Sequence, residues 1–253
     1  MISKNQIRQI QALHQKKFRD NQKLFLAEGV KMVKEIVESN HTIIQELFAT
    51  ADFIFEHENI LKSSGIKYNE ISDKELEQIS SLASPNKVLA VCNYFGETKT
   101  EVDFKKFFSL YLDDIRDPGN FGTIIRLADW YGIGTIFCSP TSCDLYNPKV
   151  IQSTMGAFLR VKVAYLPLEK IITDNNVGLI YGAVLKGKNI YAERLTNGLI
   201  VIGNEANGIS KENLALVNHP ITIPSHSANG TESLNAAMAT GIIVSEFFRQ
   251  QHY

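Results

Sequence analysis

The sequence contains little cysteine and tryptophan, and it has almost no net charge. Its 253 residues include three cysteines and one tryptophan, and 26 Lys and Arg residues stand against 27 Asp and Glu residues, giving a net charge of −1. Cys92, Cys138 and Cys143 are too few and too irregularly spaced for a disulfide scaffold, so we expect small buried hydrophobic residues there. The balanced charge excludes a global field that recruits nucleic acid, but not a local basic patch.

Long apolar runs are also missing. No run approaches the roughly 20 residues that cross a bilayer, and residues 1–6 lack the apolar core that a signal peptide needs. Hydrophobic residues make up 44% of the chain and charged residues 21%, which is typical of a globular protein and excludes disordered, collagen-like and coiled-coil chains. The sequence therefore predicts a cytoplasmic protein with no membrane segment.

Common nucleotide and metal motifs are absent as well. Gly182-x-x-x-x-Gly187-Lys188 resembles the start of a P-loop, but Asn189 stands where that motif needs Ser or Thr to hold magnesium. No G-x-G-x-x-G follows a strand, as an ordinary dinucleotide site requires. No two histidines stand at metal-ligand spacing, so we expect no metal site.

The first hundred residues alternate between helix and strand patterns. Capping boxes at Ser3-x-x-Gln6 and Ser72-x-x-Glu75 predict two helix starts. Apolar runs predict strands at 24–26, 46–50 and 88–94. The polar stretch 96–103 then predicts a linker.

After this linker, continuous apolar runs alternate with helix patterns. Such runs are typical of a parallel sheet that helices cover on both faces. They lie at 108–112, 135–138, 161–165, 179–184, 199–202 and 221–223, and a last helix is expected to begin near Thr231. We therefore expect an α/β protein with a small N-terminal domain at 1–96, a linker at 97–106 and a larger domain at 107–253.

Basic residues gather near the N-terminus. Residues 1–23 contain one acid, Asp20, and six bases: Lys4, Arg8, Lys16, Lys17, Arg19 and Lys23. This pattern fits either a solvated helix face or a patch that contacts RNA phosphates.

Three transitions from strand to loop in the larger domain end in glycine and polar residues. They lie at 111–126, 199–210 and 221–235. In open α/β sheets, ligands bind at the carboxyl ends of strands, so the three loops fit one shared site for a flat heterocycle such as adenine. The pattern alone equally fits ordinary turns and helix caps.

Together, these segments resemble the signature motifs of the SpoU (TrmH) family of RNA methyltransferases in the SPOUT superfamily. Asn120-x-Gly122-x-x-x-Arg126 is similar to the first motif, and Gly203-Asn-Glu205-x-x-Gly208 to the second. Ile223-Pro224 with Ser233-Leu-Asn235 resembles the third. Residues 147–157 resemble the helix between motifs. Lys17-x-Arg19 and residues 24–29 resemble the ribosomal-protein-like RNA-binding domain of the family.

The resemblance implies a fold, a cofactor and partners. The expected fold is a small N-terminal α/β RNA-binding domain followed by a SPOUT α/β domain with a deep trefoil knot. Family members act as homodimers through the knotted region, with S-adenosylmethionine as methyl donor. By position, the cofactor-binding residues are Gly203, Asn204, Ile223, Pro224 and Leu234.

The resemblance also implies that the RNA ribose 2′-hydroxyl, of ribosomal or transfer RNA, accepts the methyl group. The expected catalytic residues are Asn120, Arg126, Glu205, Ser233 and Asn235. A guanidinium stays protonated in most proteins, so it is a poor base. We expect Arg126 instead to hold the phosphate next to the reacting hydroxyl, while the proton leaves to a phosphate oxygen or to water.

Two other functions remain open on the sequence. One is an RNA-binding or assembly factor that keeps the fold without catalysis, and the other is methylation of a base nitrogen. The sequence also departs from the family in the third motif, where the loop 225–232 is about two residues longer than usual. This departure affects the expected cofactor contacts more than the class of enzyme.

Overall fold

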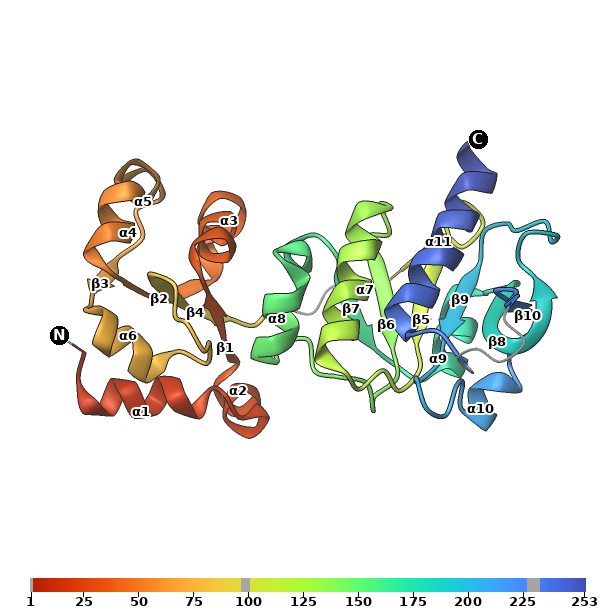
Figure 1. Cartoon of the computed structure of the whole chain (residues 1–253), viewed down its shortest axis with the longest axis horizontal. Helices are drawn as coiled ribbons and strands as arrows, with labels where there is room; N and C mark the ends of the chain where they lie inside the picture. The colour runs from red at the N-terminus through yellow and green to blue at the C-terminus, as the bar shows by residue number, and fades with distance from the viewer. Residues whose placement is uncertain (1, 97–100, 227–232) are drawn as a thin grey trace. The chain divides into compact units, whose positions relative to one another are not determined.

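A computed structural model describes residues 2–96, 101–226 and 233–253, which form two compact units. Unit 1 comprises residues 1–98 and 144–159, and unit 2 comprises residues 99–143 and 160–253. The α/β fold class expected from the sequence is confirmed (Figure 1). The division differs from the expected boundaries at two places: residues 144–159 group with unit 1 instead of with the rest of 107–253, and residues 101–106, which were expected to belong to a linker, group with unit 2.

Unit 1 is built on a four-stranded sheet in the order β1-β4-β2-β3. The strands are β1 (Leu24–Glu28), β2 (Ile44–Ala49), β3 (Tyr68–Glu70) and β4 (Val88–Asn93). β4 runs antiparallel to β1 and β2, and β2 and β3 are parallel. The sequence missed β3 because its three residues are all exposed and carry no apolar pattern.

Helices surround this sheet. They are α1 (Lys4–Ala12), α2 (Lys16–Gln22), α3 (Val30–Asn40), α4 (Ala51–Glu56), α5 (Glu58–Ser64), α6 (Asp73–Ile79) and α8 (Pro148–Thr154). Both expected capping boxes are present, with Ser3 and Gln6 starting α1 and Ser72 and Glu75 starting α6. The helices bury Leu26, Phe48 and Leu89 in a common core with residues of α1 and α6.

The segment 144–159 belongs to unit 1 through aromatic contacts and an ion pair. Tyr146 stacks on Tyr94 with ring centroids 3.7 Å apart, and Phe158 meets Phe25 edge to face at 5.8 Å. Asp144 lies 2.7 Å from a guanidinium nitrogen of Arg19. Aromatic pairs and buried ion pairs of this kind hold elements in a fixed arrangement.

Unit 2 contains a six-stranded, all-parallel sheet in the order β10-β8-β9-β5-β6-β7. The strands are β5 (Ser109–Leu112), β6 (Thr135–Cys138), β7 (Lys162–Tyr165), β8 (Ile180–Asn189), β9 (Leu199–Ile202) and β10 (His219–Thr222). β5 and β9 are buried along their whole length, as a central parallel strand between two helix layers requires. The expected parallel sheet is therefore confirmed.

The helices of unit 2 are α7 (Pro118–Trp130), α9 (Leu168–Asn175), α10 (Lys211–Leu214) and α11 (Ala236–His252). α7 and α11 lie side by side (Figure 1). α11 begins at Ala236, not near Thr231 as the periodicity suggested. The side chain of Asn235 caps it by accepting hydrogen bonds from two backbone N–H groups.

The cysteines are free thiols, and Cys92 and Cys138 are buried while Cys143 is half-buried. Burial raises the pKa of the Cys92 and Cys138 thiols, as expected for cysteines that act as small apolar residues. Within the described ranges, no helix has the length and apolar character needed to span a membrane.

Candidate active site

The candidate site lies where the parallel strands of unit 2 end. β5 is paired with β9 on one side and with β6 on the other, so the loops that follow these three strands leave the same edge of the sheet. Ligands bind at this edge in open α/β sheets. The loops 113–117, 139–143 and 203–210 therefore form the frame of the site.

The loop after β9 is closed on itself. Asn204 and Gly208 exchange two backbone hydrogen bonds of 3.0 and 2.9 Å. Gly208 adopts a φ of +67°, a conformation that glycine reaches without strain. A Cβ at Gly203 would lie 2.2 Å from the carbonyl carbon of Gly208, so only glycine fits this crossing.

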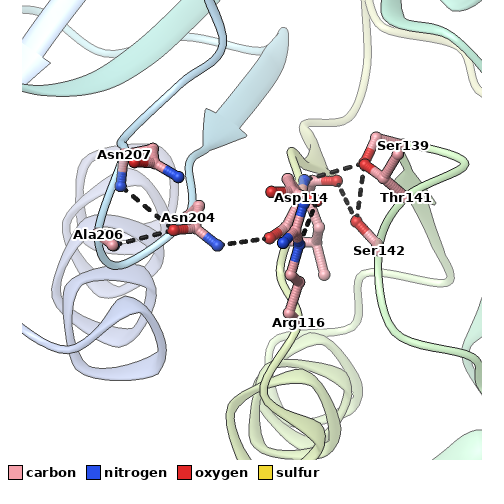
Figure 2. Close-up of polar contacts among 9 residues, drawn as sticks. Asp114, Arg116, Ser139, Thr141, Ser142, Asn204, Ala206 and Asn207 are labelled. Carbon is pink, nitrogen blue, oxygen red and sulfur yellow. Dashed lines mark hydrogen bonds and ion pairs between the residues drawn. The ribbon is translucent and has the colours of Figure 1, made fainter.

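Asn204 ties this loop to the loop after β5. Its side-chain oxygen accepts hydrogen bonds from the N–H groups of Ala206 and Asn207, at 2.9 and 3.2 Å. Its side-chain nitrogen donates to the carbonyl of Asp114 at 2.8 Å (Figure 2). We expected Asn204 to bind the cofactor, but the structure commits both ends of its side chain to the protein itself.

Asp114 occupies the centre of these contacts. Its φ is +58°, in the left-handed region that costs non-glycine residues free energy. Its N–H donates to the hydroxyl of Ser139, which also contacts the hydroxyls of Thr141 and Ser142 (Figure 2). Arg116 donates to the Asp114 carboxylate at 2.9 Å. Neighbouring loops on both sides therefore hold this backbone in place.

Asp113 adds a buried link between the same two loops. Its N–H donates to the carbonyl of Ile202 at 2.8 Å, and its carboxylate accepts from the N–H of Ser210 at 2.7 Å. A buried carboxylate needs such donors. The sequence reasoning missed Asp113 and Asp114, although both lie inside the first of the three loop segments and Asp113 directly follows a buried strand.

Three of the expected catalytic residues form one hydrogen-bonded chain. Asn235 donates its side-chain N–H to the side-chain oxygen of Asn120 at 2.9 Å. Asn120 in turn donates to the Glu205 carboxylate. Because the oxygen of Asn235 caps α11, its amide orientation is fixed, and this fixes the orientation of Asn120 as well.

The start of α7 positions Asn120. Asp117 is the N-cap and accepts a hydrogen bond from the N–H of Asn120 at 2.7 Å, and Pro118 occupies the first turn, where a missing N–H costs nothing. Arg126 follows Asn120 by six residues on the same helix. Its side chain is exposed, and it forms no ion pair or hydrogen bond with any residue that the structure describes.

The remaining expected site residues are not part of this hydrogen-bonded chain. Gly203 follows β9, and Ile223 and Pro224 follow β10, which is parallel to β9 but separated from it by β8. Ser233 and Leu234 precede α11 and are exposed. Residues 227–232, which make up most of the long loop of the third motif, lie outside the described residues. The described part of the chain contains no group of three or more His, Cys, Asp or Glu residues that can hold a metal ion.

Comparison with known proteins decides the family. The sequence profile of the SpoU rRNA methylase family matches residues 108–245, more than half of the chain. This chain belongs to the SpoU rRNA methylase family. The resemblance seen in the three motifs is thus confirmed. A second profile, that of an MRM3-like substrate-binding domain, matches residues 4–90 of this SpoU family member.

Whole-chain comparisons agree with this assignment. The chain is 27% identical over 247 residues to the 23S rRNA (guanosine(2553)-2′-O)-methyltransferase RlmP of Bacillus subtilis, covering 96% of each chain. A protein of Porphyromonas gingivalis assigned to the TrmH family of RNA methyltransferases superposes with a TM-score of 0.84 at 32% identity, covering 99% of each chain.

A third relative extends the structural likeness. The SpoU methyltransferase AviRb of Streptomyces viridochromogenes, solved in complex with AdoMet, superposes with a TM-score of 0.82 at 24% identity and covers 98% of each chain. At 24% identity, this superposition shows that the two proteins share a fold over nearly their whole length.

Proposed function

We propose that this protein is an RNA methyltransferase that transfers a methyl group from S-adenosylmethionine to a ribose 2′-hydroxyl, in ribosomal RNA or transfer RNA. The observation that carries the proposal is the hydrogen-bonded chain Asn235–Asn120–Glu205, whose middle residue lies on the helix that also bears Arg126. Membership of the SpoU family supports the reaction class, and the relative in Bacillus subtilis is named as a 2′-O-methyltransferase of 23S rRNA.

The loops fit the proposed cofactor. The N–H groups of Gly203 and Ile223 receive no protein hydrogen-bond partner within the described ranges, so both are free to meet a ligand. At Gly203 a side chain would collide with the backbone of Gly208, so this loop position takes only glycine. We propose that Gly203, Ile223, Pro224 and Leu234 hold the adenosine part, whereas Asn204 acts by shaping the loop.

S-adenosylmethionine, when bound, supplies a methyl group on a positively charged sulfonium. The residues of this chain then have to place a ribose hydroxyl in line with that methyl group, and alignment alone supplies much of the acceleration. One hydrogen bond from Asn120 engages the Glu205 carboxylate, which leaves acceptor positions for a ribose hydroxyl. Ser233 is exposed and precedes Asn235 by two residues, and it is proposed to contact the same ribose.

Arg126 is proposed to bind the phosphate beside the reacting nucleotide. Its guanidinium is exposed and takes no partner among the described residues, so it is available for a bidentate contact with phosphate oxygens. A fixed positive charge there also favours the ionised 2′-hydroxyl. The proton leaves to a phosphate oxygen or to water.

Unit 1 is proposed to bind the RNA, over the range 1–96 with the added segment 144–159. Lys4, Arg8, Lys16, Lys17 and Lys23 are exposed. Arg19 differs from the expectation: its side chain is only 2% exposed and its guanidinium is paired with Asp144. A buried and paired guanidinium cannot reach an RNA phosphate, so we omit Arg19 from the proposed RNA surface.

We also propose a homodimer through unit 2 and a knotted chain path in the catalytic range 107–253. Trp130 on α7 is 83% exposed and Met238 on α11 is 62% exposed. Large exposed apolar side chains on neighbouring helices are typical of an interface. Light scattering tests the dimer: wild type is expected to have twice the mass of the chain, and Trp130→Arg to shift it toward the monomer. We also propose that the protein acts in the cytoplasm.

The proposed reaction is tested with tritium-labelled S-adenosylmethionine and ribosomal RNA from cells that lack the modification. Label in alkali-resistant dinucleotides is expected, because a 2′-O-methyl group blocks alkaline cleavage of the neighbouring phosphodiester. Label only in alkali-sensitive mononucleotides would indicate base methylation. RNA binding with neither cofactor binding nor transfer would indicate the non-catalytic assembly factor instead.

A further inference from the structure

Helix α2 displays an aromatic ring on the outer surface of unit 1. Phe18 lies in the first turn of α2 and is 37% exposed. Arg19 is the only residue of this helix that is buried. About a third of the Phe18 side chain is therefore open to solvent on a helix whose other exposed residues are polar.

Exposed positive charges lie beside Phe18 in the sequence. Lys16 and Lys17 precede it directly, and neither forms an ion pair with the described residues. The ammonium of Lys23 lies 5.7 Å from the ring centre of Tyr94. The one acid of the helix, Asp20, accepts a hydrogen bond from the Tyr94 hydroxyl at 3.1 Å.

Three other lysines of the same unit form ion pairs. Lys34 pairs with Glu38, Lys62 with Glu58, and Lys87 with Glu56. Lys4 and Arg8 on α1 are exposed and, like the bases of α2, have no acidic partner within the described ranges. Exposed Lys31, Lys67 and Lys74 also lack an ion pair within the described ranges, but they are scattered along the sequence. The exposed cations Lys4, Arg8, Lys16, Lys17 and Lys23 all fall within residues 4–23, where they leave positive charge for an anionic ligand.

Amide side chains flank the ring. Asn21 and Gln22 follow Phe18 by three and four residues, so they lie on the same helix face, and both are exposed. Neither makes a side-chain hydrogen bond to another described residue. An aromatic ring with amides beside it and lysines around it matches an unpaired nucleotide, whose base stacks, whose edge takes hydrogen bonds and whose phosphates bind cations.

We propose that Phe18 stacks against an unpaired base of the substrate RNA, while Lys16 and Lys17 bind the flanking phosphates and Asn21 and Gln22 contact the base edge. The proposal rests on the proposed function as an RNA-modifying enzyme and narrows its substrate to RNA with a single-stranded segment at unit 1. A base inside a duplex has both faces covered by its neighbours, so Phe18 does not contribute to duplex binding.

Phe55 offers a matched control. It lies on α4 of the same unit and is 86% exposed. Asp52 and Glu56 share its short helix. An exposed ring beside acids does not attract RNA, so Phe55→Ala removes a comparable side chain without touching the proposed surface.

The experiment measures affinity for two fluorescent probes by anisotropy. One is an oligouridylate of about 12 nucleotides, within the length that single-strand sites cover, and the other is a duplex of the same length. Phe18→Ala is expected to weaken oligouridylate binding by about 5- to 10-fold and to leave duplex binding within about twofold. Phe18→Tyr keeps the ring and is expected to bind as wild type does, whereas Phe18→Leu is expected to resemble Phe18→Ala.

Three results would overturn the proposal: equal affinity of Phe18→Ala and wild type, an equal loss for both probes, or no binding of oligouridylate by wild type. Circular dichroism melting of each variant separates a lost contact from a lost fold, and Phe18→Leu, which keeps an apolar side chain without the ring, keeps the test valid if Phe18→Ala unfolds. Failure of the proposed function is a separate result, because methyl transfer by wild type is measured without either probe.

Discussion

The buried pair of Arg19 and Asp144 gives the sharpest test of how unit 1 is built. Arg19 is 2% exposed and Asp144 is 14% exposed, with 2.7 Å between the paired atoms. The other end of the guanidinium donates to the carbonyls of Leu13 and His14, each at 3.0 Å. Asp144→Ala therefore leaves a buried positive charge with only neutral partners.

The expected loss follows from the cost of an unpaired buried charge. Removing one member of a buried ion pair costs about 3–5 kcal/mol. Because water reaches part of Asp144, we expect the lower end, about 3 kcal/mol for Asp144→Ala. Asp144→Asn keeps an oxygen acceptor and is expected to cost about 1–2 kcal/mol. The double variant Arg19→Met with Asp144→Leu removes both charges and is expected to recover most of the loss.

Urea unfolding measures these changes in each unit separately. Trp130 is the single tryptophan of the chain and lies in unit 2, so its fluorescence follows that unit. Far-ultraviolet circular dichroism follows both. Asp144→Ala is expected to shift the dichroism transition of unit 1 and to leave the tryptophan transition in place.

An exposed pair supplies the control for this series. The Lys62 and Glu58 side chains are 70% and 57% exposed, so Lys62→Ala is expected to change stability by less than about 0.5 kcal/mol. If Asp144→Ala costs no more than this control, the buried pair does not stabilise unit 1. A double variant less stable than Asp144→Ala alone would likewise show that the unpaired charge is not the cause of the loss.

Three further changes have defined outcomes. Gly203→Ala forces a Cβ against the backbone of Gly208, so we expect a loss of about 1–3 kcal/mol in unit 2 and at least a tenfold weaker affinity for S-adenosylmethionine by calorimetry. Glu205→Gln keeps the size of the side chain but removes the charge that Asn120 binds, so the turnover number is expected to fall at least tenfold with RNA affinity unchanged. Burial raises the pKa of Tyr146 to about 12, so the unfolded chain ionises first and the stability of unit 1, followed by urea titration, is expected to fall as the pH rises above about 10.

Each of these changes has a matched comparison. Gly178 has open space where a Cβ would go, and Gly178→Ala with full cofactor affinity isolates the crowding at Gly203. Unchanged turnover in Glu205→Gln would contradict a role for the charge. Tyr146→Phe cannot ionise, and an alkaline loss as steep in this variant as in wild type would assign the effect to other groups.

The strands and loops were the predictable part of this protein. Continuous apolar runs such as 199–202 require burial on both faces, and this leads directly to a parallel sheet with its ligand loops at one edge. The pairing of Asn120 with Glu205 joins the first two motifs, and the motif spacing pointed to a shared site. Local sequence patterns are enough to predict those features in which a residue's contacts follow from the helix, strand or loop to which it belongs.

The features that the sequence did not show depend on partners far away in the sequence. Arg19 reads as one more base of an exposed patch, because its partner Asp144 follows 125 residues later. For the same reason the sequence did not show that residues 144–159 belong to unit 1. Asn204 sits in a glycine-rich ligand loop, and only the contact with Asp114 reveals a structural role.

The most direct test of the central claim compares Arg126→Lys and Arg126→Ala with wild type in single-turnover methyl transfer to unmodified ribosomal RNA. If the planar guanidinium binds the phosphate beside the reacting hydroxyl, both variants are expected to transfer at least about 100-fold more slowly, since alignment contributes several kcal/mol to such reactions. Cofactor affinity is expected to stay unchanged in both variants. Transfer by Arg126→Lys at nearly the wild-type rate would contradict the account.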